Sequence, residues 1–227
     1  MTRRHDLGYR PFMSYIAERR EEEKERRRGE LLDAAESLYA QHGWEAVTMD
    51  QVARTARLSR ALLYVYFRDK DDLLFAIGER AMKLLYQRFA AALETPGSGR
   101  DKVDAIGRAY MGYALEFRHF FDFCSRFQSH EVSAAAPPNE EACHQAGEAV
   151  MGLVIQAIEI GVADGSISPA LAREPRLLGA SLWAFTHGIV QITISKAGDF
   201  AQQGIAAHVF TEYAFELVRT LLRISPA

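Results

Sequence analysis

The stretch LSRALLYVYFRDK, residues 58–70, is the part of this chain that most clearly predicts its fold. Ser59 is a residue type that caps helix N-termini, so a helix is predicted to begin at residue 60. Leu63, Tyr66 and Phe67 follow at the spacing of one helix face and are expected to anchor that helix to a core. The opposite face is apolar with basic flanks, which favours docking against an anionic partner; it carries Arg60, Ala61, Leu62, Tyr64 and Val65, flanked by Arg57, Arg68 and Lys70.

The segment before this stretch supplies a second helix. Thr48 followed by Gln51 predicts a capping box, so a helix is expected from residue 49 to about residue 56. Two short helices joined by Arg57 and Leu58 form a helix-turn-helix pattern, in which the second helix lies in the major groove of DNA. A small helical hairpin with a packed inner face has the same spacing, so the pattern alone leaves both interpretations open.

Length and composition bound the fold class and the cellular compartment. A chain of 227 residues can hold one large or two small domains. Pro is absent between residues 12 and 95 and no useful alternating strand pattern occurs, so helix is expected throughout. No apolar run approaches a membrane span of roughly 20 residues and no signal peptide is recognised, which predicts a soluble cytoplasmic protein without membrane contacts. Cys124 and Cys143 fit free thiols in a reducing compartment.

The net charge of −3 hides an uneven distribution. Residues 1–70 hold 14 Lys and Arg against 12 Asp and Glu, whereas residues 71–227 hold 13 against 18. The front of the chain is therefore net +2 and the remainder net −5. An anion-binding surface is accordingly expected in the first third of the chain.

Helical periodicity and turn residues divide the chain into three parts. These are a flexible basic arm over residues 1–24, a helix-turn-helix domain over 25–72 and a helical domain over 73–227. The charged run 18–28 has Glu and Arg three or four residues apart and is interpreted as a solvated helix, with an arm along DNA as the alternative. Helices are expected over residues 26–42, 49–56, 60–67, 70–94, 102–117, 119–131, 139–163, 175–196 and 202–224, with a clear break at 95–100.

Several elements of residues 29–80 occur together in one known family. They are LLDAA and LYAQHGW, Thr48 at the start of the second helix, the LYxYF core of the third helix, and Lys70 with Leu73 and Leu74. This run closely resembles the DNA-binding domain of TetR-family transcriptional regulators. The resemblance implies an all-α fold in which a three-helix helix-turn-helix domain is joined by a long helix to a C-terminal helical ligand-binding and dimerisation domain. It implies DNA contacts at Thr48, Arg60, Ala61, Tyr64, Tyr66 and Lys70, and Arg57, Ser59 and Leu62 of the same segment are also predicted to bind DNA.

Side-chain chemistry agrees with most of these roles. The Tyr64 phenol can donate to a phosphate, Lys70 is a point cation, and Arg60 matches guanine O6 and N7. Tyr66 fits the core equally well, because it lies on the same side as Leu63. Arg57 departs from the family, which usually has glycine there, and a left-handed backbone would cost Arg more than Gly. Leu62 also departs from the usual small residue or Thr, and suits either a thymine methyl or packing.

The resemblance is weaker in the C-terminal part, where it rests on WAFTHG at residues 183–188. It implies a pocket for a small effector, and the residues suggest a lipophilic or aromatic one. Aromatic residues at helical spacing fit ordinary core equally well. The candidate ligand-binding residues are Tyr110, Tyr113, Phe117, Phe121, Cys124, Phe127, Trp183, His187 and Gln191.

A metal-responsive regulator is the competing ligand class. His119, Cys124, His130, Cys143 and His144 offer imidazole and thiol groups, but their spacing is not that of a compact metal site. Neither a metal nor a cofactor is therefore predicted.

The last two long helices are the implied dimer interface, as a four-helix bundle about a two-fold axis. Each of their apolar residues also fits the core of one subunit. The candidates are Leu178, Leu182, Phe185, Ile189, Val209, Tyr213, Leu217 and Leu221.

The sequence thus predicts a ligand-responsive regulator, most simply a repressor that binds an inverted-repeat operator as a homodimer. An enzyme is not favoured, because no phosphate loop, dinucleotide fingerprint or nucleophile elbow is found. The alternative is a helical dimerisation protein of the same fold without sequence-specific DNA binding.

Overall fold

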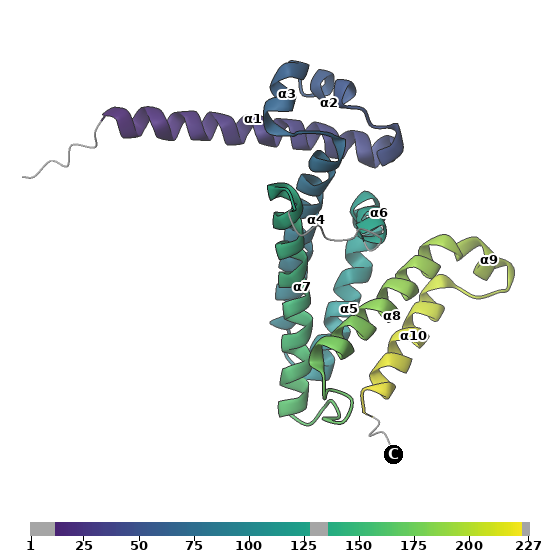
Figure 1. The fold of residues 1–227 in the computed structure, drawn as a ribbon. Coiled ribbons are helices and arrows are strands. Elements are labelled where there is room, and N and C mark those ends of the chain that lie inside the picture. The colour runs from purple at the N-terminus through teal and green to yellow at the C-terminus, as the bar shows by residue number, and fades with distance from the viewer. Residues whose placement is uncertain (1–11, 128–135, 224–227) are drawn as a thin grey trace, which may run out of the picture. The chain divides into compact units, whose positions relative to one another are not determined.

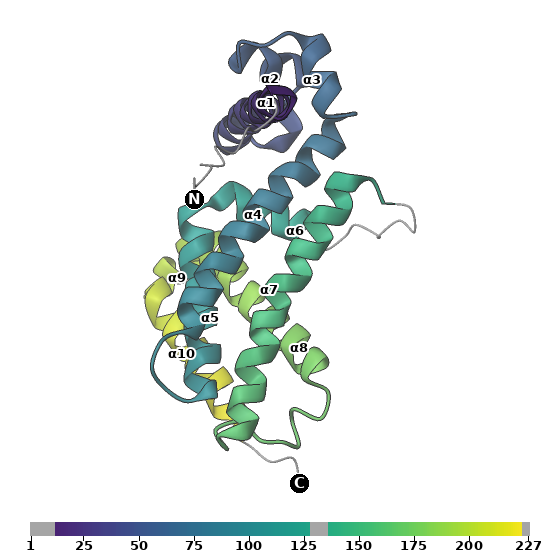
Figure 2. The same ribbon diagram turned by 90° about the vertical axis from the view of Figure 1, so that its left-hand side faces the viewer.

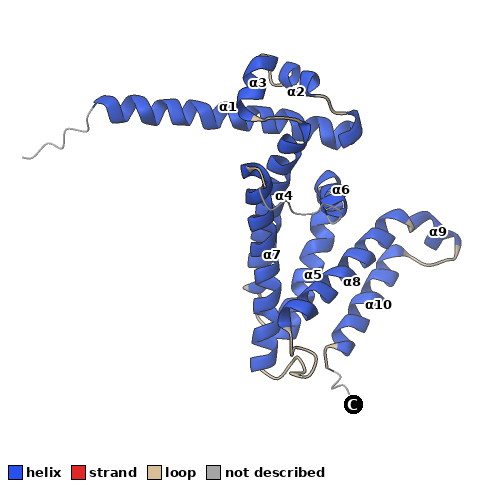
Figure 3. Cartoon of the chain, in the orientation of Figure 1, coloured by secondary structure: helices blue, strands red, loops and turns tan. Residues whose placement is uncertain are grey.

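A computed structural model describes residues 12–127 and 136–223 of the chain. Within these residues every regular element is a helix and no strand occurs (Figure 3). The chain forms two compact units that divide between Leu73 and Leu74, so the division falls inside the long helix α4, Lys70–Leu93.

The first unit is built from α1 (Phe12–His42), the short 3-10 helix η1 (Trp44–Ala46), α2 (Met49–Thr55), α3 (Arg60–Tyr66) and the first residues of α4 (Figure 1). Its core is apolar and aromatic, and the rings of Tyr39 and Trp44 lie 5.3 Å apart. This core holds α2 and α3 against the C-terminal half of α1, and it includes Leu31, Ala35, Tyr39, Val52, Leu63, Phe67 and Leu73.

Helix α1 begins at Phe12, well before the predicted start near residue 26. The described part of the predicted flexible arm, residues 12–24, is therefore helical, while residues 1–11 lie outside the described part. Charged pairs three or four residues apart explain the extension, since Lys24 bonds Glu21 at 3.3 Å and Arg27 bonds Glu23 at 2.6 Å. The Arg26 guanidinium, followed by that of Arg27, lowers the pKa of Glu23.

The second unit contains the rest of α4 with α5 (Gly99–Glu116), α6 (Arg118–Phe127), α7 (Pro138–Ala163), α8 (Pro175–Ser195), α9 (Ala197–Gln202) and α10 (Ala207–Leu221). Helix α5 lies at its centre and packs against α6, α7, α8 and α10 (Figure 2). Ser98 and Asp101 form a capping box that starts α5. Gly99 allows α5 to approach α7 closely, because a Cβ there would lie 2.0 Å from the backbone nitrogen of Gly161.

Two sequence-based expectations for this unit are wrong. The last helix, predicted over residues 202–224, begins only at Ala207, after a turn in which Gly204 has a φ of 71°, and the predicted gap after residue 196 contains the short helix α9. The second expectation was that no segment is long and apolar enough to span a membrane. By length and composition alone, α7 and α8 each are. Both pack against α5 and against each other, and core helices of soluble proteins have the same composition.

Candidate nucleic-acid interface and ligand cavity

N-terminal caps fix the residues at which α2 and α3 begin, as predicted. The Thr48 hydroxyl accepts from the Gln51 backbone N–H at 3.3 Å, and the Gln51 side chain accepts from the Thr48 N–H at 2.8 Å. The Ser59 hydroxyl accepts from the backbone N–H of Leu62 at 3.1 Å. Each cap satisfies backbone donors that a helix start leaves without partners, so both helices begin at set residues.

Arg57 occupies the strained position of the turn between α2 and α3. Its φ is 56°, and among the described residues other than glycine it alone has a positive φ. The Leu58 N–H donates to the Ala53 carbonyl at 2.9 Å and the Arg57 N–H donates to the Arg54 carbonyl at 3.0 Å, which is the Schellman pattern that ends a helix. The left-handed backbone expected at this residue is therefore present, with Arg where glycine is the usual choice.

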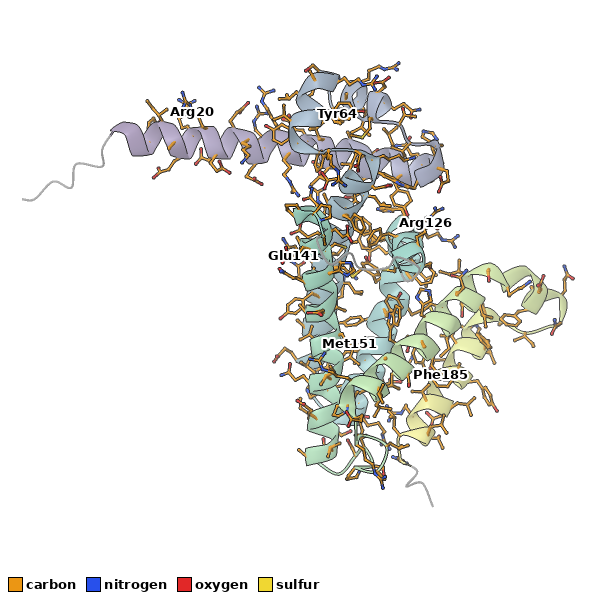
Figure 4. All side chains as sticks on the ribbon, in the orientation of Figure 1. Arg20, Tyr64, Arg126, Glu141, Met151 and Phe185 are labelled. Atoms are coloured by element: carbon orange, nitrogen blue, oxygen red, sulfur yellow. The ribbon has the colours of Figure 1, made fainter. Side chains whose placement is uncertain are left out.

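The exposed face of α3 carries most of the predicted DNA-binding residues. Arg60, Ala61 and Tyr64 are exposed, whereas Leu62 and Tyr66 are half-buried. Leu63 and Phe67 are fully buried on the opposite face and fasten the helix to the unit. Figure 4 labels Tyr64 on this helix. Val65, which is 76% exposed, adds an apolar side chain to the same surface.

Arg60 is already ordered by its neighbours. Its Nη1 lies 3.0 Å from Oδ1 of Asp50, its Nη2 lies 3.5 Å from the Tyr64 hydroxyl, and the guanidinium carbon lies 5.6 Å from the centre of the Tyr64 ring. The contact between Asp50 and Arg60 was not predicted, because only the fold brings the first turn of α2 beside the start of α3. The acidic residue in the first turn of α2 was the available signal.

The side chains of Lys70 and Thr48, both predicted to bind DNA, already have partners within the first unit. The Lys70 ammonium donates to the Glu45 carbonyl at 3.3 Å and lies 5.1 Å from the centre of the Trp44 ring. The Thr48 hydroxyl also donates to the Gln51 side chain at 2.8 Å.

A cavity of about 360 Å³ lies inside the second unit among α4, α5, α6, α7 and α8. Its wall is mainly apolar and aromatic, with His144 and Glu148 of α7 as polar members. Three of the predicted ligand-binding residues line it: Tyr110, Cys124 and Trp183. Sequence reasoning missed the contributions of α4 and α7, namely Met82, Leu85, Phe89, His144, Gly147, Glu148, Val150, Met151 and Val154.

The other predicted ligand-binding residues whose side chains the structure describes do not line this cavity. Tyr113 is fully buried and its hydroxyl donates to the Ala81 carbonyl at 3.1 Å. Phe117 packs on Tyr113 with ring centres 5.8 Å apart, and Gln191 is exposed. Phe121 stacks on His187 with ring centres 4.8 Å apart. The side chain of Phe127 lies outside the described part of the structure.

His187 connects three helices next to the cavity. Its Nδ1 lies 2.8 Å from the Tyr110 hydroxyl and its Nε2 lies 3.3 Å from the Ser125 hydroxyl. Ser125 donates its own proton to the Phe121 carbonyl at 3.1 Å, so its oxygen accepts from Nε2–H and Nδ1 accepts from Tyr110. Burial lowers the pKa of His187, which keeps the ring neutral as this arrangement requires.

The candidate metal-binding residues that the structure describes do not form a cluster. Among the residues that the structure describes, no three His, Cys, Asp or Glu side chains gather around a possible metal position. Burial raises the pKa values of Cys124 and Cys143 to about 12, so both are thiols at neutral pH when no metal is bound. His130 falls outside the described residues.

Helices α8 and α10 leave a row of large apolar side chains uncovered. Of the predicted interface residues, Leu182 and Ile189 are buried inside the subunit and Leu178 is half-buried. The other five are at least half exposed: Phe185, Val209, Tyr213, Leu217 and Leu221. Phe185 is labelled in Figure 4. A groove of about 260 Å³ runs between the two helices, lined by Leu178, Phe185 and Leu221 among others.

Known proteins share both parts of this architecture. Residues 31–77 match the family described as bacterial regulatory proteins of the tetR family, and residues 103–216 match the tetracyclin repressor-like C-terminal domain. The HTH-type transcriptional activator FasR of Mycolicibacterium smegmatis is 30% identical over 131 residues, which cover 54% of this chain and 58% of FasR.

Solved structures agree with these matches. A TetR/AcrR-family regulator from Thermobifida fusca is 21% identical with a TM-score of 0.65, over 85% of this chain and 96% of that one. FadR of Bacillus subtilis, solved in complex with stearoyl-CoA, is 14% identical with a TM-score of 0.65, over 86% of this chain and 98% of FadR. Because the C-terminal match alone spans half of the sequence and the helix-turn-helix match precedes it, this chain belongs to the TetR family of bacterial transcriptional regulators.

Proposed function

We propose that this protein is a ligand-responsive repressor that binds an inverted-repeat operator as a homodimer and leaves DNA when a lipophilic or aromatic molecule occupies the 360 Å³ cavity. The observation that carries the proposal is the exposed face of α3. Arg60, Tyr64 and Val65 project from this face, while the opposite face of the helix packs against the rest of the unit. A cytoplasmic location follows from this role.

The geometry of α3 suits the major groove of DNA. Arg60 lies at the start of the helix, which is the end that contacts base edges in helix-turn-helix proteins. Its ion pair with Asp50 is exposed, and exposed pairs contribute only about 0–1 kcal/mol. Breaking this pair so that Arg60 can bind guanine therefore costs little free energy. Tyr64 and Lys70 then supply phosphate contacts that fix the register of the helix.

The uncovered apolar face of α8 and α10 supports a homodimer. Soluble monomers rarely expose so many large apolar side chains in one place. A second copy related by a two-fold axis would cover the face with the same residues and complete a four-helix bundle. The two α3 helices would then read half-sites about 34–36 Å apart, or a multiple of that distance.

The cavity supports a lipophilic effector. Its wall is mainly apolar with a few polar groups, which is the usual character of small-molecule sites. The FadR structure, which has a similar fold, contains stearoyl-CoA. A protein of this fold that lacks sequence-specific DNA binding is the second candidate, and the strained Arg57 turn is the observation that favours it.

Selection of binding sites from random duplex DNA tests the proposal. The full chain should enrich an inverted repeat, and Tyr64→Ala and Lys70→Ala should weaken or abolish the enrichment. Arg118→Ala, which changes an exposed arginine of the second unit, serves as the control and should enrich the same repeat. Enrichment of a single half-site would reject the homodimer, and no enrichment by the unmodified chain would favour the second candidate.

A further inference from the structure

Arg100, in the first turn of α5, is a buried arginine without an ion pair. The residue is 8% exposed, and within the described residues its Nε atom has no hydrogen-bond partner. The described carboxylates form no salt bridge with it either, although Asp101 and Asp104 lie on the same helix. A buried charge without a partner is costly, so the Arg100 guanidinium needs polar partners beyond the direct contacts that the described residues supply.

The side chain of Arg100 lies between two hollows. On one side is a cavity of about 40 Å³ that also contains Asp104, whose Oδ1 has no partner within the described residues. That volume holds a water molecule, which would bridge Arg100 Nε and Asp104 Oδ1. On the other side is an open groove of about 560 Å³, lined by Arg100, Arg223 and the loop of residues 165–169.

The groove is built by contacts between distant segments. The Ser166 hydroxyl accepts from the backbone N–H of Arg100 at 3.0 Å, which ties the loop after α7 to the start of α5. The backbone N–H of Ser168 donates to the Leu222 carbonyl at 3.1 Å, which ties the same loop to the end of α10. Arg100 and Arg223, which are far apart in the sequence, therefore line one surface.

Among the residues that the structure describes, no carboxylate lines the groove to balance its positive charges. Its lining residues include two arginines and no Asp or Glu. The nearby described acids lie outside the groove: Asp101 pairs with Arg219 at 3.0 Å, and Asp164 accepts from the backbone N–H groups of Gly99 at 2.7 Å and Ser166 at 2.9 Å. Asp104 pairs with Arg108 at 2.9 Å and borders the 40 Å³ cavity on the other side of Arg100. The hydrogen bonds of Asp164, from Ser166 first and then from Gly99, lower its pKa. Two positive charges consequently face the groove.

We propose that this groove is an anion site, separate from the effector cavity, that binds a phosphate dianion or the phosphate group of a small metabolite. Guanidinium groups match phosphate oxygens through paired N–H donors, and a charge of −2 balances Arg100 and Arg223 better than a single carboxylate does. A bound phosphate would join the start of α5, the loop after α7 and the end of α10. It would thereby fasten the helix that carries Tyr213 and Leu217 of the uncovered apolar face.

Calorimetric titration of the full chain with inorganic phosphate at pH 7.5 and constant ionic strength tests this site without DNA. The expected result is saturable binding of one phosphate per subunit, weakened at least tenfold in Arg100→Gln and at least threefold in Arg223→Ala. Arg118→Ala should bind like the unmodified chain. Arg223 is exposed, so its variant reports on the site even where Arg100→Gln fails to fold.

Other outcomes separate the possible ligands. Tighter binding of glucose 6-phosphate than of inorganic phosphate would assign the site to a phosphorylated metabolite, and equal binding would assign it to free phosphate. Acetate binding as tightly as phosphate would overturn the proposed dianion. No saturable binding by the unmodified chain, or equal weakening by Arg118→Ala, would overturn the site itself.

Discussion

Tyr64 shows what one residue contributes on the face of α3. Its phenol is 43% exposed and stands beside Arg60, so it can donate one hydrogen bond to a phosphate. Tyr64→Phe removes only that hydroxyl and should weaken DNA binding about tenfold, because a partly exposed hydrogen bond to a charged group contributes about 1.5 kcal/mol. The loss should be similar on every DNA sequence, as is typical of phosphate contacts.

Fluorescence anisotropy with labelled duplexes measures this effect. Tyr86→Phe alters an exposed tyrosine of the second unit and should leave the affinity unchanged. A loss confined to one preferred sequence would show instead that Tyr64 reads bases.

Arg57 stores backbone strain in the turn between α2 and α3. Its side chain is exposed, so replacing it removes little packing, and only the backbone preference of the new residue matters. Because glycine tolerates the φ of 56° and alanine does not, Arg57→Gly should be more stable than Arg57→Ala by about 1 kcal/mol. Urea unfolding of the two variants measures the difference, and equal stabilities would mean that the turn is not strained.

His187 makes the stability of the second unit depend on pH. Burial lowers its pKa, so the unfolded chain takes up a proton near pH 6.5 that the folded protein takes up only at lower pH. The unfolded state then binds more protons, and the free energy of unfolding should decrease as the pH falls below about 6.5.

His187→Gln is the matched variant, because glutamine retains a donor and an acceptor but does not titrate. The decrease in unfolding free energy between pH 7.5 and pH 5.5 should be smaller in this variant than in the unmodified chain. An identical decrease in both would show that other groups cause the pH dependence.

At the scale of the element, α7 offers a direct way to fill the cavity. Gly147 lines the cavity, and a Cβ added there would meet no atom within 4 Å. Gly147→Leu should therefore fold and should abolish binding of a hydrophobic dye such as 8-anilinonaphthalene-1-sulfonate. Gly152→Leu is the control, because Gly152 has the same open space on the same helix but does not line the cavity. Equal dye binding by both variants would place the dye site elsewhere.

The elements differ in how far the sequence predicts them. Both caps of the helix-turn-helix were predictable, because each involves groups only three residues apart, such as Thr48 and Gln51. The start of α10 was predicted five residues too early because helical periodicity continues across the turn at Gly204, where φ is 71°. The cavity wall was predicted only in part, because Met82 and Met151 meet through tertiary packing that no local pattern records.

For the whole molecule, three features have to act together in the proposed regulator. The exposed face of α3 would bind DNA, the apolar face of α8 and α10 would set the distance between two such helices, and the cavity would change that distance when it is filled. Family membership is established for the chain, whereas operator, effector and sign of regulation follow from the proposal. FasR, which is 30% identical over 58% of its length, is named as an activator.

The affinity ratio between specific and unspecific DNA tests the central claim most directly. The measurement compares the dissociation constant for the selected inverted repeat with that for a duplex of the same length and composition in scrambled order, at about 150 mM salt. A sequence-specific regulator should prefer its operator by about 1,000-fold or more. Equal affinities for the two duplexes would contradict the account and leave a helical protein that binds DNA by charge alone.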